Sequence, residues 1–184
     1  MKILAFTGMP FSGKSEAVAI AKEQGLPVIR MGDMVWKEVK KQKLPLNSET
    51  VGRIAKEMRE IYGKDYWARK TIEQVKQNDD SKLIVIDGIR NREEISRFRN
   101  DLSQQFVVIA ITVSKDVRYQ RALARGRVDD PDDIKKIEER DEREEGWGVR
   151  EVIDSADIQI KNDEDLESFR EKVNEILNRE RLMQ

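Results

Sequence analysis

The chain has 184 residues, of which 38% are hydrophobic and 39% charged, and its 35 Lys and Arg nearly cancel its 36 Asp and Glu. It contains no Cys and no His, which excludes disulfides, thiol catalysis, a histidine base and the usual transition-metal ligands. The length fits one domain, and the charge balance argues against nucleic-acid binding. No early apolar run is long enough for a signal peptide or a membrane span, so we expect a cytoplasmic protein without membrane contact.

The first elements predicted are a strand, a loop, a helix and a second strand. The apolar run Lys2–Thr7 is typical of a buried parallel strand, and the loop Gly8–Ser15 follows it. Helix-forming residues dominate Lys14–Gln24, and Gly25 ends that segment. Pro27–Met31 then predicts a second buried strand.

An all-helical stretch follows the second strand. Asp33 and Ser48 are predicted N-caps, because their side-chain oxygens can accept from the first free backbone amides of a helix. The predicted helices cover Met34–Lys41, Ser48–Tyr62 and Asp65–Gln77. Because this stretch is too long for a simple crossover between strands, residues 33–78 are interpreted as a helical insertion.

The second half of the chain alternates strands and helices. Strands are predicted over Leu83–Asp87, Phe106–Val113 and Asp157–Ile160. Helices are predicted over Arg92–Leu102, Lys115–Arg125, Pro131–Glu145 and Glu164–Arg181. With crossovers long enough for parallel pairing, the alternation predicts a three-layer α/β fold in a single domain spanning residues 1–184.

The loop after the first strand fits the pattern G-x-x-x-x-G-K-S/T, and its residues are Gly8, Met9, Pro10, Phe11, Ser12, Gly13, Lys14 and Ser15. The two glycines let the backbone curl so that its amides point inward at an anion, and the following helix adds its positive end. Lys14 is expected to reach the β- and γ-phosphates, and Ser15 to bind Mg²⁺. The pattern, in this strand-loop-helix context, predicts a site for ATP with Mg²⁺.

A carboxylate closes the third predicted strand. In proteins with this phosphate loop, a carboxylate at that position faces Mg²⁺, so Asp87 is a candidate metal residue; a cap for the turn at Gly88 is the alternative. Phe11 is unusual, because many kinase loops of this type carry glycine there, and it could alter access to the γ-phosphate.

Three arginines lie on and just after one predicted helix. Arg121 and Arg125 are four residues apart and so share a face, and Arg127 follows the glycine at 126. A guanidinium can stack on adenine or bind phosphate oxygens, so residues 126–148 are predicted to form a lid over ATP. The acidic group Asp129, Asp130, Asp132 and Asp133 is interpreted as a helix N-terminus rather than a metal cluster.

Several stretches resemble adenylate kinase and its relatives. They are Met31 to Met34, Asp87 to Arg90 with Gly88, and the arginines at 121, 125 and 127. The ending Ala156 to Asp163 is closer to dephospho-coenzyme A kinases. The whole chain, including Glu139 to Glu144 and Gly146 to Gly148, most resembles an uncharacterised archaeal family of P-loop kinase-like proteins.

This resemblance implies a P-loop kinase sheet with strand order 2-3-1-4-5. It implies ATP contacts at Gly13, Lys14, Ser15, Arg121 and Asn162. It further implies acceptor contacts at Asp33 and Arg90, with lid contributions from Arg127 and Arg140. Two features depart from adenylate kinase: Trp36 replaces an arginine that clamps the acceptor phosphate, and the cysteines of some lids are absent.

Two kinds of acceptor molecule are compatible with the sequence. A nucleotide phosphate needs no base, and Arg59 and Arg90 could hold it, whereas a hydroxyl such as that of dephospho-coenzyme A would be helped by a base, with Asp33 as the candidate. We favour a nucleoside monophosphate, with the hydroxyl acceptor second. A nucleotide-dependent regulator is the alternative of another class, with the charged helix Pro131–Glu145 as its partner surface. The sequence does not predict the oligomeric state.

Overall fold

All strands of the sheet run parallel, in the order β2-β3-β1-β4-β5. The computed structural model describes residues 1–78, 81–102, 105–125 and 133–183. The strands are β1 (Lys2–Thr7), β2 (Val28–Arg30), β3 (Leu83–Asp87), β4 (Gln105–Thr112) and β5 (Ile158–Lys161). The predicted α/β class and the strand order implied by the resemblance are therefore confirmed.

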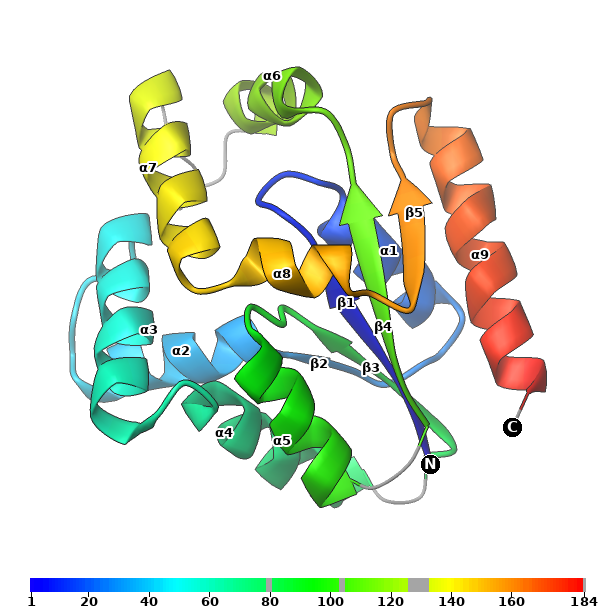
Figure 1. Ribbon diagram of the computed structural model, residues 1–184, viewed down its shortest axis with the longest axis horizontal. Coiled ribbons are helices and arrows are strands. Elements are labelled where there is room, and N and C mark those ends of the chain that lie inside the picture. Colours follow the sequence, from blue (N-terminus) through cyan, green and yellow to red (C-terminus); the bar gives the residue numbers. More distant parts are fainter. Residues whose placement is uncertain (79–80, 103–104, 126–132, 184) are drawn as a thin grey trace.

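Helices lie on both faces of this sheet (Figure 1). They are α1 (Lys14–Glu23), α2 (Met31–Lys41), α3 (Ser48–Tyr62), α4 (Tyr66–Val75), α5 (Arg92–Leu102), α6 (Lys115–Arg125), α7 (Ile134–Gly146), α8 (Val149–Asp154) and α9 (Leu166–Leu182), with a short 3₁₀ turn at Lys76–Asn78. In the described residues, no helix is both long and apolar enough to span a bilayer.

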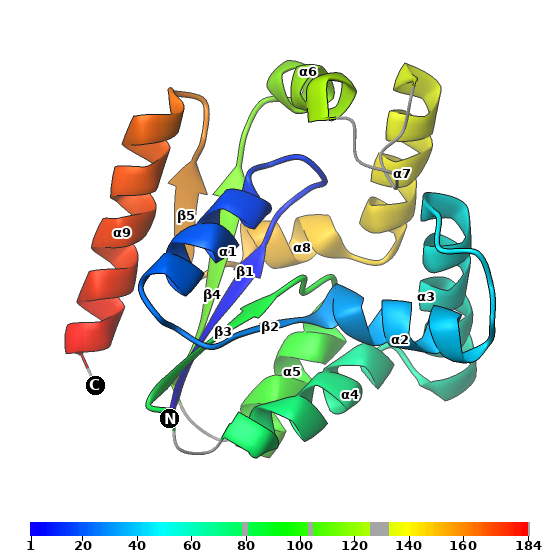
Figure 2. The same cartoon turned by 180° about the vertical axis from the view of Figure 1, so that it is seen from behind.

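Alternation along the strands divides the core in two. In β1, Ile3 and Ala5 face one core and Leu4 and Phe6 face the other, as expected for a strand buried on both sides. The first core takes its helical residues from α2, α3, α4, α5 and α8. The second takes them from α1 and α9, which lie side by side in both views (Figure 2). Each face of the sheet is thus covered by its own group of helices.

Strand β1 and helix α9 are joined by an ion pair between Lys2 and Glu180. The Lys2 ammonium lies 2.7 Å from a carboxylate oxygen of Glu180 and donates to the Glu180 carbonyl at 3.1 Å. Both side chains are buried. The first strand and the last helix are therefore tied by a buried ion pair.

Several predicted helix starts and caps differ from the structure, and α4 and α9 begin one and two residues later than predicted. Helix α2 begins at Met31, with Arg30 in the cap position, so Asp33 lies in the first turn instead of capping it. Asn47, not Ser48, caps α3 by accepting from the Thr50 amide at 2.9 Å. Helix α7 begins at Ile134 in the described residues, where the Asp133 side chain accepts from the Lys136 amide and caps it; Pro131, the predicted start, lies outside the described residues.

One helix was not predicted. Helix α8 spans six residues and buries Val149 and Val152, too short a pattern to show a helical period in the sequence.

Candidate functional site

The phosphate loop joins the carboxyl end of β1 to the start of α1. Gly8 and Gly13 have φ angles of 149° and 110°, which favour glycine. A Cβ on Gly8 would lie 2.5 Å from the Ile111 carbonyl oxygen, and one on Gly13 would lie 2.2 Å from the Asn162 amide nitrogen. Both glycines are therefore required by backbone conformation and by space.

Asn162 and Arg121 brace this loop from outside. The side-chain amide of Asn162 is buried and donates to the Ser12 carbonyl at 2.8 Å. Arg121 in turn donates to the backbone carbonyl of Asn162 at 3.0 Å. The two residues that the resemblance assigns to ATP thus lie together at the loop, and in the structure they support its backbone.

Phe11 lies in the loop with a φ of 63°, a left-handed conformation that costs a residue with a side chain roughly 1–2 kcal/mol. Its buried ring packs with Ala122 of α6 and Ile137 of α7. The guanidinium carbons of Arg125 and Arg140 lie 4.7 Å and 5.3 Å from the ring centroid. Packing and cation–π contacts offset the backbone cost and attach the loop to both helices.

Lys14 is held by the loop's own backbone. Its ammonium donates to the carbonyls of Gly8 at 2.7 Å and Met9 at 2.9 Å. Burial, followed by the positive charge of Arg90, lowers the pKa of Lys14 to about 7, although Asp87 acts in the opposite direction. An anion bound here would reverse that balance by favouring the charged ammonium.

Asp87 ends β3 opposite Phe6, so the parallel register brings its carboxylate beside the start of the phosphate loop. One oxygen, Oδ1, is buried and has no hydrogen-bond partner among the described residues. The other lies 3.8 Å from the Arg30 guanidinium. A carboxylate oxygen without a partner, lining one cavity with the exposed Ser15, fits the oxygen ligands that Mg²⁺ prefers.

Two cavities meet at this end of the sheet. The larger, of about 470 Å³, lies over the phosphate loop and is lined by Lys14, Ser15, Arg121 and Arg125 among others. The smaller, of about 180 Å³, lies between α2, α3 and α7. Their common wall consists of Arg30, Asp87, Arg90 and Arg140. This arrangement follows the general rule that ligands bind at the carboxyl ends of parallel strands.

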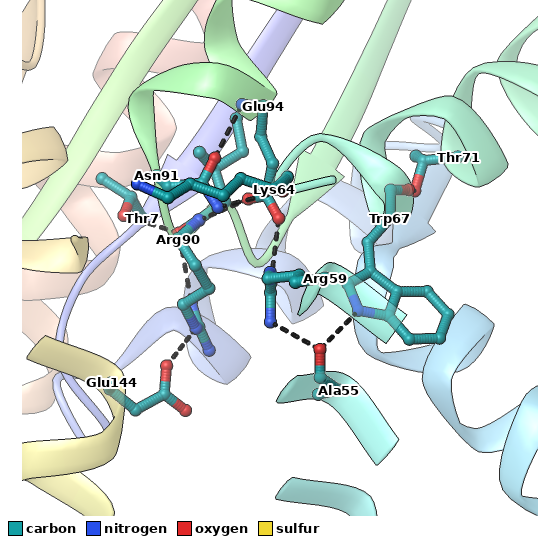
Figure 3. A network of polar contacts seen from close by, with 11 residues as sticks. Thr7, Ala55, Arg59, Lys64, Trp67, Thr71, Arg90, Asn91, Glu94 and Glu144 are labelled. Atoms are coloured by element: carbon teal, nitrogen blue, oxygen red, sulfur yellow. Dashed lines mark hydrogen bonds and ion pairs between the residues drawn. The ribbon is translucent and has the colours of Figure 1, made fainter. Parts of the chain in front are cut away.

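A buried network fixes the backbone of Arg90 (Figure 3). The Arg90 amide donates to one oxygen of Glu94 at 2.8 Å, and Arg59 of α3 donates to the other, also at 2.8 Å. Asn91 accepts from the Glu94 amide at 2.7 Å. The Arg90 side chain is left to extend toward α7, where it forms an ion pair with Glu144.

Helix α7 is held over the phosphate loop by a second buried pair. Arg118 of α6 donates to both carboxylate oxygens of Asp141, at 2.9 Å and 2.6 Å, and to the Pro10 carbonyl at 3.1 Å. Ile137, Asp141 and Glu144 form the buried face of α7. Asp141 and Glu144 were not predicted, because a charged helix is ordinarily solvated; their spacing with Ile137 was the available signal.

Other predicted residues lie farther from the cavities. The Asp33 carboxylate, whose side chain is 44% exposed, is 3.8 Å from Arg30, and Asp33 is not among the described residues that line either cavity. Its role as a base stays a prediction. The Ser12 hydroxyl is buried without a partner in the described part of the chain. Arg127, Asp129, Asp130 and Asp132 lie outside the described residues.

Comparison with known proteins identifies relatives of the chain. The AAA domain family matches residues 7–138, from the end of β1 into α7. A UPF0200 protein of Methanosarcina acetivorans is 43% identical over 178 residues, covering 97% of this chain and 95% of its own length. One from Methanopyrus kandleri is 42% identical over 173 residues, covering 92% of this chain and 86% of its own.

Two solved structures share the fold. A Thermus thermophilus protein matches with a TM-score of 0.66 at 16% identity, over 97% of both chains. Shikimate kinase from Aquifex aeolicus matches with a TM-score of 0.52 at 17% identity, over 96% of both chains. At these identities the likeness establishes the P-loop kinase-like fold. The chain therefore belongs to the AAA domain family and, more narrowly, to the archaeal UPF0200 family.

Proposed function

We propose that this chain is an ATP- and Mg²⁺-dependent kinase that transfers the γ-phosphoryl group of ATP to a nucleotide-type acceptor, with a nucleoside monophosphate as the favoured acceptor. The observation that carries the proposal is the pair of cavities that share Asp87 and Arg90 as a wall. One cavity is lined by the phosphate loop and the other by residues of α2, α3 and α7, and both include this shared wall. A transferase needs two substrates to meet in this way.

Within this proposal the loop residues bind the donor. The backbone amides of the loop and Lys14 hold the β- and γ-phosphates, while Arg121 and Arg125, which also line the larger cavity, are available to the rest of ATP. Ser15 and Asp87 would hold Mg²⁺, which neutralises phosphate charge when bound. The shared wall of arginines serves the acceptor and the group in transfer, and Arg127 is proposed as a further contribution from the lid at 126–148.

The transfer itself requires positioning more than covalent help. An acceptor oxygen forms a bond to the γ-phosphorus as the bond from that phosphorus to the β–γ bridging oxygen breaks, and ADP leaves with the electron pair. A nucleoside monophosphate attacks with an oxygen that is already ionised, so no proton has to be removed. Arg59 and Arg90, both lining the smaller cavity, suit such an anion.

A second acceptor is supported by a different observation. The carboxylates of Asp87 and Glu144 line the smaller cavity, and Trp36 lies there in place of an arginine. A hydroxyl acceptor, as in dephospho-coenzyme A, could pass its proton to such a carboxylate. For a hydroxyl acceptor, the candidate base is Asp87 or Glu144 in place of Asp33, because those two carboxylates line the cavity.

The proposal is tested by a substrate screen. The purified protein is incubated with ATP and Mg²⁺ and, in separate reactions, with each nucleoside monophosphate and with dephospho-coenzyme A, and ADP formation is followed. A kinase forms ADP rapidly only with its acceptor. Slow ADP formation that no acceptor accelerates, together with a protein partner that binds in one nucleotide state only, would instead identify a regulatory ATPase.

A further inference from the structure

Glu144 of α7 is a carboxylate enclosed by cations. Its side chain is 6% exposed and forms an ion pair with Arg90. Burial opposes its charge, but the positive charges of Arg90, Arg140, Lys14 and Arg143 outweigh burial and hold the pKa of Glu144 below its ordinary value. Glu144 is therefore an anion that lines the smaller cavity, where it pairs with Arg90 of the wall shared with the larger one.

The surroundings of Glu144 carry more donors than Glu144 can satisfy. Nε and Nη1 of Arg140 and Nε of Arg59 are buried and have no hydrogen-bond partner among the described residues. Arg59 is 9% exposed and lines the smaller cavity together with Arg90 and Arg140. Unpaired guanidinium nitrogens are donors that fit the oxygens of a phosphate or carboxylate. The cavity thus has the composition of an anion site already partly filled by one internal carboxylate.

The smaller cavity is also too small for a whole nucleotide while α7 stays docked. Its volume of about 180 Å³ falls below the roughly 300–1,000 Å³ of sites for small molecules. Arg118 with Asp141 holds one part of α7. Arg143 holds another, because its guanidinium lies against Gly52 of α3, where a Cβ would come within 2.7 Å of the Arg143 Cζ. An acceptor must therefore take space that α7 side chains now fill.

We propose that Glu144 occupies, in the ligand-free protein, the position of the acceptor's phosphate monoester, and that the acceptor binds by exchange, with its phosphate replacing Glu144 at Arg90 and Arg140. The proposal rests on the kinase function above and deepens it by naming a specificity-determining residue. Exchange is favoured over addition because a phosphate dianion and Glu144 sharing Arg90 would repel each other. An acceptor without an anionic group cannot displace Glu144 and is rejected.

Calorimetric titration without ATP tests the exchange. The probes are AMP, inorganic phosphate and adenosine, and the proteins are the wild type, Glu144→Gln and the control Glu145→Gln. Glu145 is the neighbouring exposed carboxylate on α7, paired with Arg150 at the surface. Removing the internal competitor should tighten AMP binding about tenfold or more, the equivalent of one hydrogen bond to a charged group. Adenosine should gain nothing, and Glu145→Gln should match the wild type.

Comparing AMP with inorganic phosphate shows whether the site binds a nucleotide monoester or phosphate alone. A larger gain for AMP than for inorganic phosphate identifies a nucleotide monoester, and equal gains identify phosphate alone. Unchanged or weaker AMP binding by Glu144→Gln would overturn the exchange, since Glu144 would then position Arg90 for binding. Absence of AMP and phosphate binding in all proteins would remove the anion site itself.

If Glu144→Gln does not fold, the variant Glu144→Asp tests the same exchange. Glu144→Asp keeps the charge on a shorter side chain, so it should pair less well with Arg90 and tighten AMP binding in the same direction. Because no arm of this experiment contains ATP, the exchange can fail while acceptor-dependent ADP formation in the screen succeeds, and the reverse. Different measurements therefore test the exchange and the kinase function.

Discussion

The phosphate loop and the smaller cavity share a wall, yet the chain builds them by different means. The loop is a continuous segment whose shape depends on Gly8 and Gly13 and whose donors are mainly backbone amides. The cavity is assembled from side chains of α2, α3, α7 and the β3–α5 loop, and most of its charges form pairs between elements. A site of the first kind is fixed locally, whereas one of the second kind depends on how α7 is docked.

The largest effect is expected in the loop. Lys14→Ala should lower phosphoryl transfer by roughly 10²–10³-fold or more, because it removes a preorganised charge at the phosphates, and should leave the fold intact. Rates of ADP formation and thermal melting check both parts. Lys22→Ala, an exposed lysine on the same helix, is the control and should retain full activity. Full activity of Lys14→Ala would refute the assigned role.

The corresponding change in the cavity should affect the acceptor alone. Arg90→Ala should raise the acceptor KM by roughly 10–100-fold, the loss of a charged hydrogen bond, with little change in the ATP KM. It also leaves Glu144 without its ion-pair partner, so the melting temperature should fall, and the double variant with Glu144→Gln should recover part of that fall.

Arg92→Ala is the matched control for this change. Its side chain is 63% exposed and pairs only weakly with Glu151 at 3.7 Å. Equal effects of Arg90→Ala on both KM values would count against placing Arg90 at the acceptor.

An intermediate effect concerns pH and nucleotide binding. With its pKa near 7, Lys14 in the free protein is mostly neutral at pH 8, whereas a bound polyphosphate favours the ammonium. Binding at pH 8 should therefore take up close to one proton, and the affinity should fall as pH rises above 7, at most about tenfold per unit. Calorimetry at pH 8 in buffers of different ionisation enthalpy measures the uptake. The same uptake in Lys14→Met would assign it to another group.

The smallest effect is expected where α7 meets α3. Gly52→Ala adds a methyl group that must push Arg143 aside, so acceptor affinity should fall a few-fold. Stability should change by less than about 1 kcal/mol, since alanine improves the helix. Gly146→Ala, where a Cβ meets no described atom within 4 Å, should leave affinity unchanged. Titration and thermal melting compare them, and unchanged affinity in Gly52→Ala would exclude Arg143 from the acceptor site.

The difference between a site built from neighbouring residues and one assembled from distant elements explains which features could be predicted from the sequence. The phosphate loop, the strands and the sheet class depend on neighbouring residues, so their patterns are visible in the chain. Arg59 with Glu94, and Arg90 with Glu144, join helices and loops far apart in sequence, and no local pattern reports such a pair. A helix rich in charged residues is usually exposed to solvent, so the burial of Glu144 on α7 was not predicted.

The position of β1 has a consequence for how the protein forms. Both neighbours of this central strand, β3 and β4, come later in the chain, and so do Asn162, which braces the loop, and Glu180, which ties down Lys2. The phosphate loop is therefore made before the strands, the asparagine and the helix α9 that support it. Pairings of such long sequence separation slow folding. The phosphate loop thus gains these supporting contacts only after β5 and α9 have been made.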